Sequence, residues 1–243
     1  KIMSGMDDII RRAKELGPVD QNYQCQYCGK RYAKESTLAS HLCEPKRRHQ
    51  QRGEKGVVLG FEAYRKFYKF TQGRENKTYD EFAKSPYYAA FVKFGRYLHS
   101  IDAVKPERFI EWVIKNNKKL DHWCKEAFYD EYLLEYTRIE NPQDALERSI
   151  LEMNSWSAET GSPVNHYFRY ASENRIARTI ANGRISPWAV YTSASGMAAL
   201  EKFNQEQITM VYPWIDPDYW NVKLKRYSDD VAWCKSVMSE AGF

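Results

Sequence analysis

The sequence predicts a mainly α protein in which a small ββα module near the N-terminus precedes an all-helical domain. Two cysteines near the N-terminus are separated by two residues, which is the spacing of a metal-binding turn. From residue 57 onward, apolar side chains recur at three- and four-residue intervals, as on amphipathic helices. We therefore expect an N-terminal helix within residues 1–21, the module and a basic linker in residues 22–56, and one helical domain in residues 57–243.

The composition is that of a globular chain in a reducing compartment. Hydrophobic residues make up 43% of the sequence and charged residues 28%, which argues against a disordered tail. No run approaches the ~18 consecutive apolar residues of a spanning helix, so we expect no membrane partner. Five cysteines, an odd number that includes one closely spaced pair, favour thiols and metal over a disulfide framework. We expect a cytoplasmic location.

The first helix is expected over residues 4–16. Ser4 can cap it, and Asp8 suits its first turn because the helix dipole favours negative charge there. A Gly-Pro pair at 17–18 is expected to end it.

The ββα module is predicted by the spacing Cys25-x2-Cys28-x12-His41. Tyr32 and Leu38 stand between these residues, where an aromatic side chain and a leucine form the small core of such a module. Over about 25 residues the pattern resembles the two-Cys two-His zinc finger family, whose hairpin and helix hold a tetrahedral Zn²⁺. The resemblance implies that Cys25, Cys28 and His41 bind zinc and that the metal supplies most of the module's folding free energy.

The fourth ligand departs from the family pattern, in which a second histidine follows the first by three to five residues. Here Cys43 follows His41 by two residues and His49 follows it by eight. Pro45 disfavours a helical conformation at Glu44 and is expected to end the helix there. A chain that turns at this point can return Cys43 to the metal, so we favour Cys43 and keep His49 as the alternative.

The basic residues around this module point to a polyanionic partner. Residues 1–60 hold 12 lysines and arginines against 7 acidic residues, whereas the rest of the chain has 25 of each. The helix positions that read bases in DNA-binding fingers correspond here to Lys34, Thr37 and Ser40. The neighbouring cations expected to contact phosphates include Lys30, Arg31, Lys46, Arg47 and Arg48. One finger covers only ~3 base pairs, so we expect DNA binding that is non-specific or structure-selective.

Helices are expected almost throughout residues 57–243. Thr78 and Glu81 have the spacing of a capping box. Further helices are expected to begin at a polar residue followed by proline, namely at Ser85-Pro86, Lys105-Pro106, Asn141-Pro142 and Ser186-Pro187. An aromatic group at the start of the domain has the spacing of a core: Phe61, Tyr64, Phe67 and Tyr68. Residues 212–219, rich in proline and aromatic residues, are expected to be a connection.

No arrangement of residues typical of an active site is recognisable, so we expect that the protein is not an enzyme. Asp216 and Asp218 form one of the closest carboxylate pairs, but we identify no further acidic partners of a metal-dependent nuclease. The sequence contains no glycine-rich phosphate-binding loop.

Three stretches of the helical domain, KTYDEFAKSPYYAAFVKFGRYL, ISPWAV and IDPDYW, resemble proteins of T4-type bacteriophages. The order of aromatic helices between Tyr64 and Ile150 is similar to that of the T4-type helicase loader, an all-helical protein that binds forked DNA. The resemblance implies a phage accessory factor in DNA replication, recombination or late transcription, acting in the host cytoplasm with a phage or host protein as a further partner. The alternative is a protein-interaction adaptor or virion component with a structural zinc finger.

Overall fold

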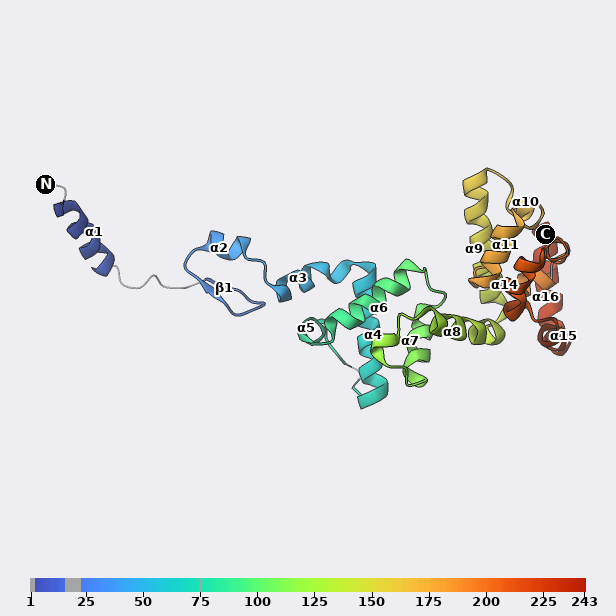
Figure 1. Cartoon of the computed structure of the whole chain (residues 1–243), viewed down its shortest axis with the longest axis horizontal. Helices are drawn as coiled ribbons and strands as arrows, with labels where there is room; N and C mark the ends of the chain where they lie inside the picture. The colour runs from blue at the N-terminus through green and yellow to red at the C-terminus, as the bar shows by residue number, and fades with distance from the viewer. Residues whose placement is uncertain (1–2, 16–22, 75) are drawn as a thin grey trace. The chain divides into compact units, whose positions relative to one another are not determined.

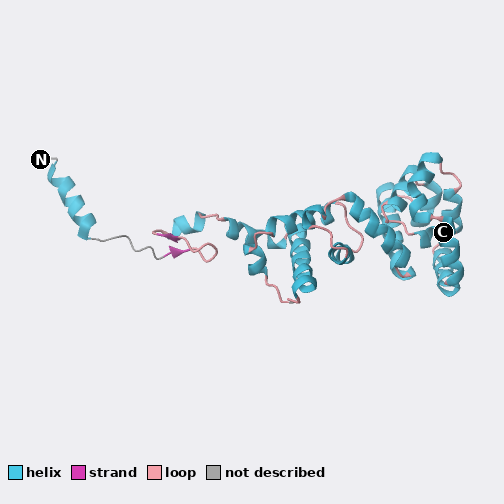
Figure 2. Cartoon of the chain, turned by 60° about the horizontal axis from the view of Figure 1, so that its bottom comes forward, coloured by secondary structure: helices cyan, strands magenta, loops and turns pink. Residues whose placement is uncertain are grey.

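A computed structural model describes residues 3–15, 23–74 and 76–243 of the chain. The described residues are mainly helical, as predicted, and their strands are confined to one two-stranded sheet near the N-terminus (Figure 2). Contacts divide the chain into two compact units, Lys1–Ile101 and Asp102–Phe243. The division falls inside the segment 57–243, which we had expected to form a single domain.

The first unit contains the ββα module and a set of helices that follow it (Figure 1). Its elements are α1 (Met3–Glu15), β1 (Tyr23–Gln24), β2 (Arg31–Tyr32), α2 (Glu35–Ser40), α3 (Glu44–Gln50), the 3₁₀ helix η1 (Gln51–Gly53), α4 (Lys55–Gln72), α5 (Tyr79–Lys84) and α6 (Tyr88–Ser100). The basic stretch 49–56, expected as a linker, lies in α3, η1 and the start of α4.

Helices α4 and α6 pack with their backbones in close contact (Figure 1). Gly56 and Gly60 lie one turn apart on α4 and face Gly95 of α6. A Cβ atom on Gly60 would lie 2.7 Å from the carbonyl oxygen of Phe91, and one on Gly95 would overlap the backbone of Gly56 and Gly60. Only glycine permits this approach, which lets the aromatic side chains on both helices meet.

Aromatic rings fill the space beside this contact. Tyr64 is 3% exposed, and its ring centroid lies 5.1 Å from that of Phe82 and 5.5 Å from that of Phe91. Phe61 also packs on Phe82, at 5.4 Å. Such pairs contribute beyond their buried area. Of the four aromatic residues whose spacing predicted a core, Tyr64 is buried, whereas Phe61, Phe67 and Tyr68 are only half-buried.

The second unit is all-helical. Its elements are α7 (Pro106–Lys115), η2 (Leu120–His122), α8 (Glu126–Ile139), α9 (Pro142–Thr160), η3 (Val164–His166), α10 (Tyr167–Tyr170), α11 (Glu173–Ala181), α12 (Pro187–Tyr191), α13 (Ala194–Leu200), α14 (Gln205–Ile215), α15 (Pro217–Arg226) and α16 (Ser228–Glu240). Helices α7, α9 and α12 begin at Pro106, Pro142 and Pro187, as predicted.

A buried ion pair joins Glu140, between α8 and α9, to Arg148 of α9, and a hydrogen bond joins the same carboxylate to the start of α12. The fully buried Glu140 carboxylate accepts from Arg148 at 2.6 and 2.8 Å and from the Ser186 hydroxyl at 2.9 Å. Arg148 also donates to the carbonyl of Gly183 at 2.7 Å. Because the carboxylate has three donors, its burial is compensated.

Several expected helix boundaries were wrong. Ser4 does not cap the first helix, because it lies inside α1, and the expected end of that helix at residues 17–18 lies outside the described residues. Two more differences lie after residue 57. Pro86 does not begin a helix, because Ser85 instead ends α5 and α6 starts at Tyr88. Residues 212–219 are not an open connection, since α14 runs through Pro213 to Ile215 and α15 begins at Pro217. The Asp216 side chain accepts from the backbone N–H groups of Asp218 and Tyr219. Helix α15 therefore begins with a polar residue followed by proline, as α7, α9 and α12 do.

We predict that Gly95→Ala destabilises the first unit by about 2 kcal/mol, because overlap with rigid backbone costs more than the ~1 kcal/mol gained in helix propensity. Gly53→Ala is the control, since a Cβ there meets nothing within 4 Å. Urea unfolding of the full chain measures both. Equal stability of the two variants would contradict the close contact of α4 and α6.

Candidate metal centre

The first two candidate ligands lie on the turn between two short strands. Strands β1 and β2 are antiparallel, with Gln24 opposite Arg31. The turn is closed by the N–H of Gly29, which donates to the carbonyl of Cys25 at 2.8 Å, and by the N–H of Cys25, which donates to Lys30 at the same distance. Gly29 has φ +74°, which glycine adopts without strain. The turn therefore holds the sulfur atoms of Cys25 and Cys28 close to each other.

The other two candidate ligands lie on the turn between α2 and α3. Helix α2 ends at Ser40, one residue before His41, which is extended with φ −67° and ψ 122°. Cys43 is the N-cap residue of α3, and Pro45 lies in the first turn of that helix. The expectation that His41 is helical and that Pro45 ends its helix was therefore wrong, because the chain turns earlier and Pro45 begins the next helix. Lys46 donates to the carbonyl of His41 at 2.9 Å and thereby holds the turn.

The structure brings together the four residues that the sequence indicated. One donor atom from each of Cys25, Cys28, His41 and Cys43 lies within 4.8 Å of every other. The sulfur atoms of Cys25 and Cys43 are 3.9 Å apart, and the Cys28 sulfur is 3.2 Å from Nε2 of His41. A tetrahedral ion with metal–sulfur bonds of ~2.3 Å requires sulfur atoms about 3.8 Å apart. The cluster has the size and the donors to hold a tetrahedral metal ion.

The turn also prepares one sulfur for ionisation. Burial raises the pKa of the Cys25 thiol. Hydrogen bonds from the backbone N–H groups of Cys28 and Tyr27 and from the neighbouring thiols lower it, and together they exceed the effect of burial, so the pKa is lowered overall. For Cys28, the backbone N–H of Lys30 lowers the pKa, but burial and the sulfurs of Cys25 and Cys43 together outweigh it and raise the pKa. Thiolates are the form that binds metal.

Tyr32 orients the imidazole. Its hydroxyl lies 2.8 Å from Nδ1 of His41, while Nε2 faces the cysteine sulfurs. When Nε2 binds a metal, Nδ1 carries the ring's proton and donates a hydrogen bond to the Tyr32 oxygen. From the sequence we expected Tyr32 only as part of the small core, so this contact is a function that the spacing alone did not reveal.

The alternative ligand, His49, lies outside the cluster. It is on α3, where its Nε2 is 3.4 Å from a carboxylate oxygen of Asp80. Its ring packs against Tyr27 and Tyr79, with centroids 4.9 and 5.4 Å away. His49 thus connects the finger to α5 and does not contribute to the group of four donors.

The residues expected to contact nucleic acid fall into two groups. The first group consists of predicted contact residues whose side chains are exposed on the ββα module: Lys30, Arg31, Lys34, Thr37 and Ser40. The other three residues, Lys46, Arg47 and Arg48, have partners within the protein. Lys46 donates to the carbonyls of Ala39 and His41. Arg47, which is exposed, pairs with Glu44.

Arg48 is the most strongly engaged of these cations. It lies 3.1 Å from Glu44, donates to the carbonyl of Ala83 at 2.7 Å and packs over the ring of Tyr88 at 4.5 Å. The carbonyl of Arg48 accepts from Tyr79 at 2.6 Å. Arg48 therefore stabilises the packing of α3 on α5 and α6.

No protein-family model matches this chain, and no curated protein or solved structure matches it either. Among its described residues, no helix is both long and apolar enough to cross a membrane.

We predict that Cys43→Ser weakens zinc binding by more than the 10- to 100-fold typical of a change outside the ligand set, because it removes a thiolate donor. His49→Gln is the matched control and should leave the affinity nearly unchanged. Competition with a zinc-binding dye measures both on the full chain. A larger loss for the histidine variant would exclude the Cys43 site.

A second prediction concerns Tyr32. Tyr32→Phe should weaken zinc binding by about tenfold, because the imidazole loses the acceptor that fixes its orientation. Tyr23→Phe, at an exposed ring of the same hairpin, provides the comparison in the same assay. Indistinguishable affinities would show that the hydroxyl has no part in orienting His41.

Proposed function

We propose that the chain binds Zn²⁺ through Cys25, Cys28, His41 and Cys43 and uses the finger to dock on DNA. Three thiolates and one imidazole are the donor set of a structural zinc site. No position in such a set is left for a substrate or a reactive water. The proposed metal therefore holds the fold, and the proposed function is non-enzymatic.

The exposed cations of the finger are the observation that carries the DNA proposal. Lys30, Arg31 and Lys34 are exposed cations of a module whose acidic residues are Glu35, exposed beside Lys34, and Glu44, which is paired with Arg47 and Arg48. A phosphate backbone offers such cations a favourable electrostatic partner.

The short helix supports binding without sequence readout. Helix α2 has six residues, which corresponds to about 9 Å at 1.5 Å per residue. The side chains of Thr37 and Ser40 are short, and the hydroxyl of Ser40 donates to the carbonyl of Thr37 at 3.2 Å. We therefore propose non-specific or structure-selective binding to DNA.

The biological setting rests on the sequence resemblance to T4-type bacteriophage proteins. On that basis we propose an accessory factor in phage DNA replication, recombination or late transcription, with a phage or host protein as a second partner.

A protein-interaction adaptor or virion component with a structural zinc finger is the second candidate. Leu42, between His41 and Cys43, is 61% exposed. A large apolar side chain held in solvent by the metal turn is a feature that a protein partner can bury.

The DNA proposal predicts a specific salt dependence. Contact of phosphates with Lys30, Arg31 and Lys34 gives a slope of about −3 for log affinity against log salt, at about 0.9 per contact. Lys30→Glu combined with Arg31→Glu should weaken duplex binding by at least tenfold and reduce the slope by about 2. Fluorescence anisotropy of zinc-loaded full chain measures both quantities.

The control replaces two exposed lysines of the second unit, Lys202→Glu with Lys235→Glu, which changes the net charge equally. If both double variants lose the same affinity, the attraction is that of overall charge and the finger is not the contact. If the wild-type chain binds neither duplex, single strand nor fork, the adaptor candidate replaces the DNA proposal.

A further inference from the structure

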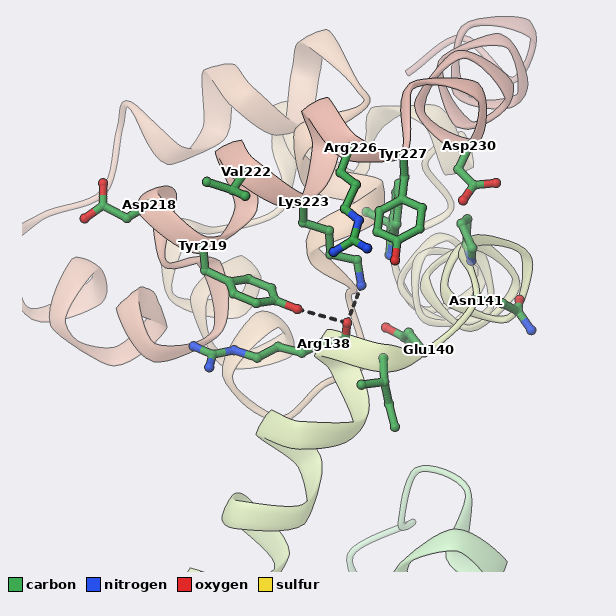
Figure 3. A pocket seen from close by; sticks show the side chains of 13 residues that line it. Arg138, Glu140, Asn141, Asp218, Tyr219, Val222, Lys223, Arg226, Tyr227 and Asp230 are labelled. Atoms are coloured by element: carbon green, nitrogen blue, oxygen red, sulfur yellow. Dashed lines mark hydrogen bonds between the residues drawn. The ribbon is translucent and has the colours of Figure 1, made fainter.

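The second unit contains a cavity of about 680 Å³, which is within the range of small-molecule sites. Its walls come from the end of α8, the start of α9, Trp188 of α12, helix α15 and the start of α16 (Figure 3). All of these elements belong to one compact unit. None of its lining residues belongs to the candidate metal centre, so what it binds is a separate question from the proposed DNA contact.

Lys223 lies on the wall of this cavity in unusual surroundings. Its ammonium and the Tyr219 hydroxyl both donate to the carbonyl of Arg138 at the end of α8, as the dashed lines in Figure 3 show. The ammonium also lies 5.4 Å from the ring centroid of Trp188 and 5.2 Å from that of Trp220. Burial lowers the pKa of Lys223. An anion in the cavity would offset this burial by stabilising the charged form.

Arg226 supplies a second cation beside it. It lies three residues after Lys223 on α15, so both side chains leave the same face of the helix, and both line the cavity (Figure 3). Arg226 is exposed, and its guanidinium packs 5.8 Å from the ring of Tyr227. Among the described residues, no carboxylate lies within ion-pair distance of it.

The acidic residues of the wall offset part of the charge of Lys223, because Glu140 and Asp230 both raise its pKa against the larger effect of burial. Glu140 is occupied by Arg148 and Ser186. Asp218 and Asp230 are drawn at opposite ends of the lining in Figure 3, with the two cations between them. The third cation, Arg138, is 3.8 Å from Asp216. An anionic group is therefore favoured beside Arg226, which no carboxylate of the described residues pairs, with Lys223 as its neighbour, and hydroxyl or amine donors are favoured beside Asp218 and Asp230.

Two donor atoms of wall residues lie behind its surface. The indole N–H of Trp188, a residue that is 1% exposed, and Nε of Arg138 have no acceptor among the described residues. Because both atoms are shielded from solvent, neither can donate to a ligand in the cavity, and the recognition of an anion rests on Arg226 and Lys223. A phosphate monoester has three acceptor oxygens and a charge that suits Lys223 and Arg226 together.

The remaining wall suits a flat group. The ring of Tyr227 is 44% exposed and Val222 is 67% exposed, and both line the cavity. An exposed tyrosine ring can stack on a planar heterocycle.

We propose that this cavity binds a nucleoside monophosphate. Arg226 and Lys223 hold its phosphate. Tyr227 stacks on the base, and Asp218 or Asp230 accepts from sugar hydroxyls or the exocyclic amine.

Isothermal titration of the zinc-loaded full chain with adenosine and uridine 5′-monophosphate tests the proposal, with adenosine and inorganic phosphate as partial ligands. Both nucleotides should bind more tightly than either partial ligand. Arg226→Gln should weaken nucleotide binding by about tenfold or more. Lys225→Gln is the control, because Lys225 is an exposed neighbour on the same helix that does not line the cavity, and it should bind like wild type.

The proposal is overturned if neither nucleotide binds at millimolar concentration, if adenosine binds as tightly as its monophosphate, or if Arg226→Gln and Lys225→Gln have equal effects. Binding of only a 5′-phosphorylated oligonucleotide would overturn the small-molecule assignment. The variant Lys30→Glu with Arg31→Glu should retain nucleotide binding, which keeps the outcome separate from that of the DNA proposal.

Discussion

The finger depends on the convergence of three sulfur atoms and one imidazole nitrogen, because residues 23–43 have almost no core of their own. Cys25 is the one buried residue in this range. Two strands of two residues and a helix of six cannot bury enough apolar surface to offset the entropy of ordering the chain. A bound metal that joins the two turns would supply the missing free energy. The positions of Tyr32, Lys30 and α2 then all follow from the same four donors.

The sequence indicated all four donors of this site but not their surroundings. The spacing of Cys25, Cys28 and His41 is specific. Cys43 was favoured over His49 because Pro45 was expected to end the helix of His41, whereas the chain turns earlier and Pro45 lies in the first turn of α3. The roles of Lys46 and Arg48 were not predictable from residue type, because a basic side chain can face a phosphate or cap a carbonyl. The fold decides between these two roles, and here it places Arg48 against Ala83 and Tyr88, far away in sequence.

In the helices as well, features set by neighbouring residues in the sequence were predicted, whereas features set by the packing of distant segments were not. The starts of α7, α9 and α12 were predicted because a polar residue followed by proline is a local signal. The division after Ile101 and the contact of Gly60 with Phe91 depend on which helices meet, and no local pattern encodes that. The cavity in the second unit is likewise formed by segments around residues 138–142, 188 and 218–230, which only the tertiary structure brings together.

X-ray absorption spectroscopy at the zinc edge tests the central claim most directly, because it counts the donors of the bound metal in the full chain. Coordination by Cys25, Cys28, Cys43 and His41 predicts three sulfur neighbours at about 2.3 Å and one nitrogen at about 2.0–2.1 Å. Two sulfurs with two nitrogens would instead place a second histidine on the metal, and a shell of mainly oxygen would contradict the site altogether.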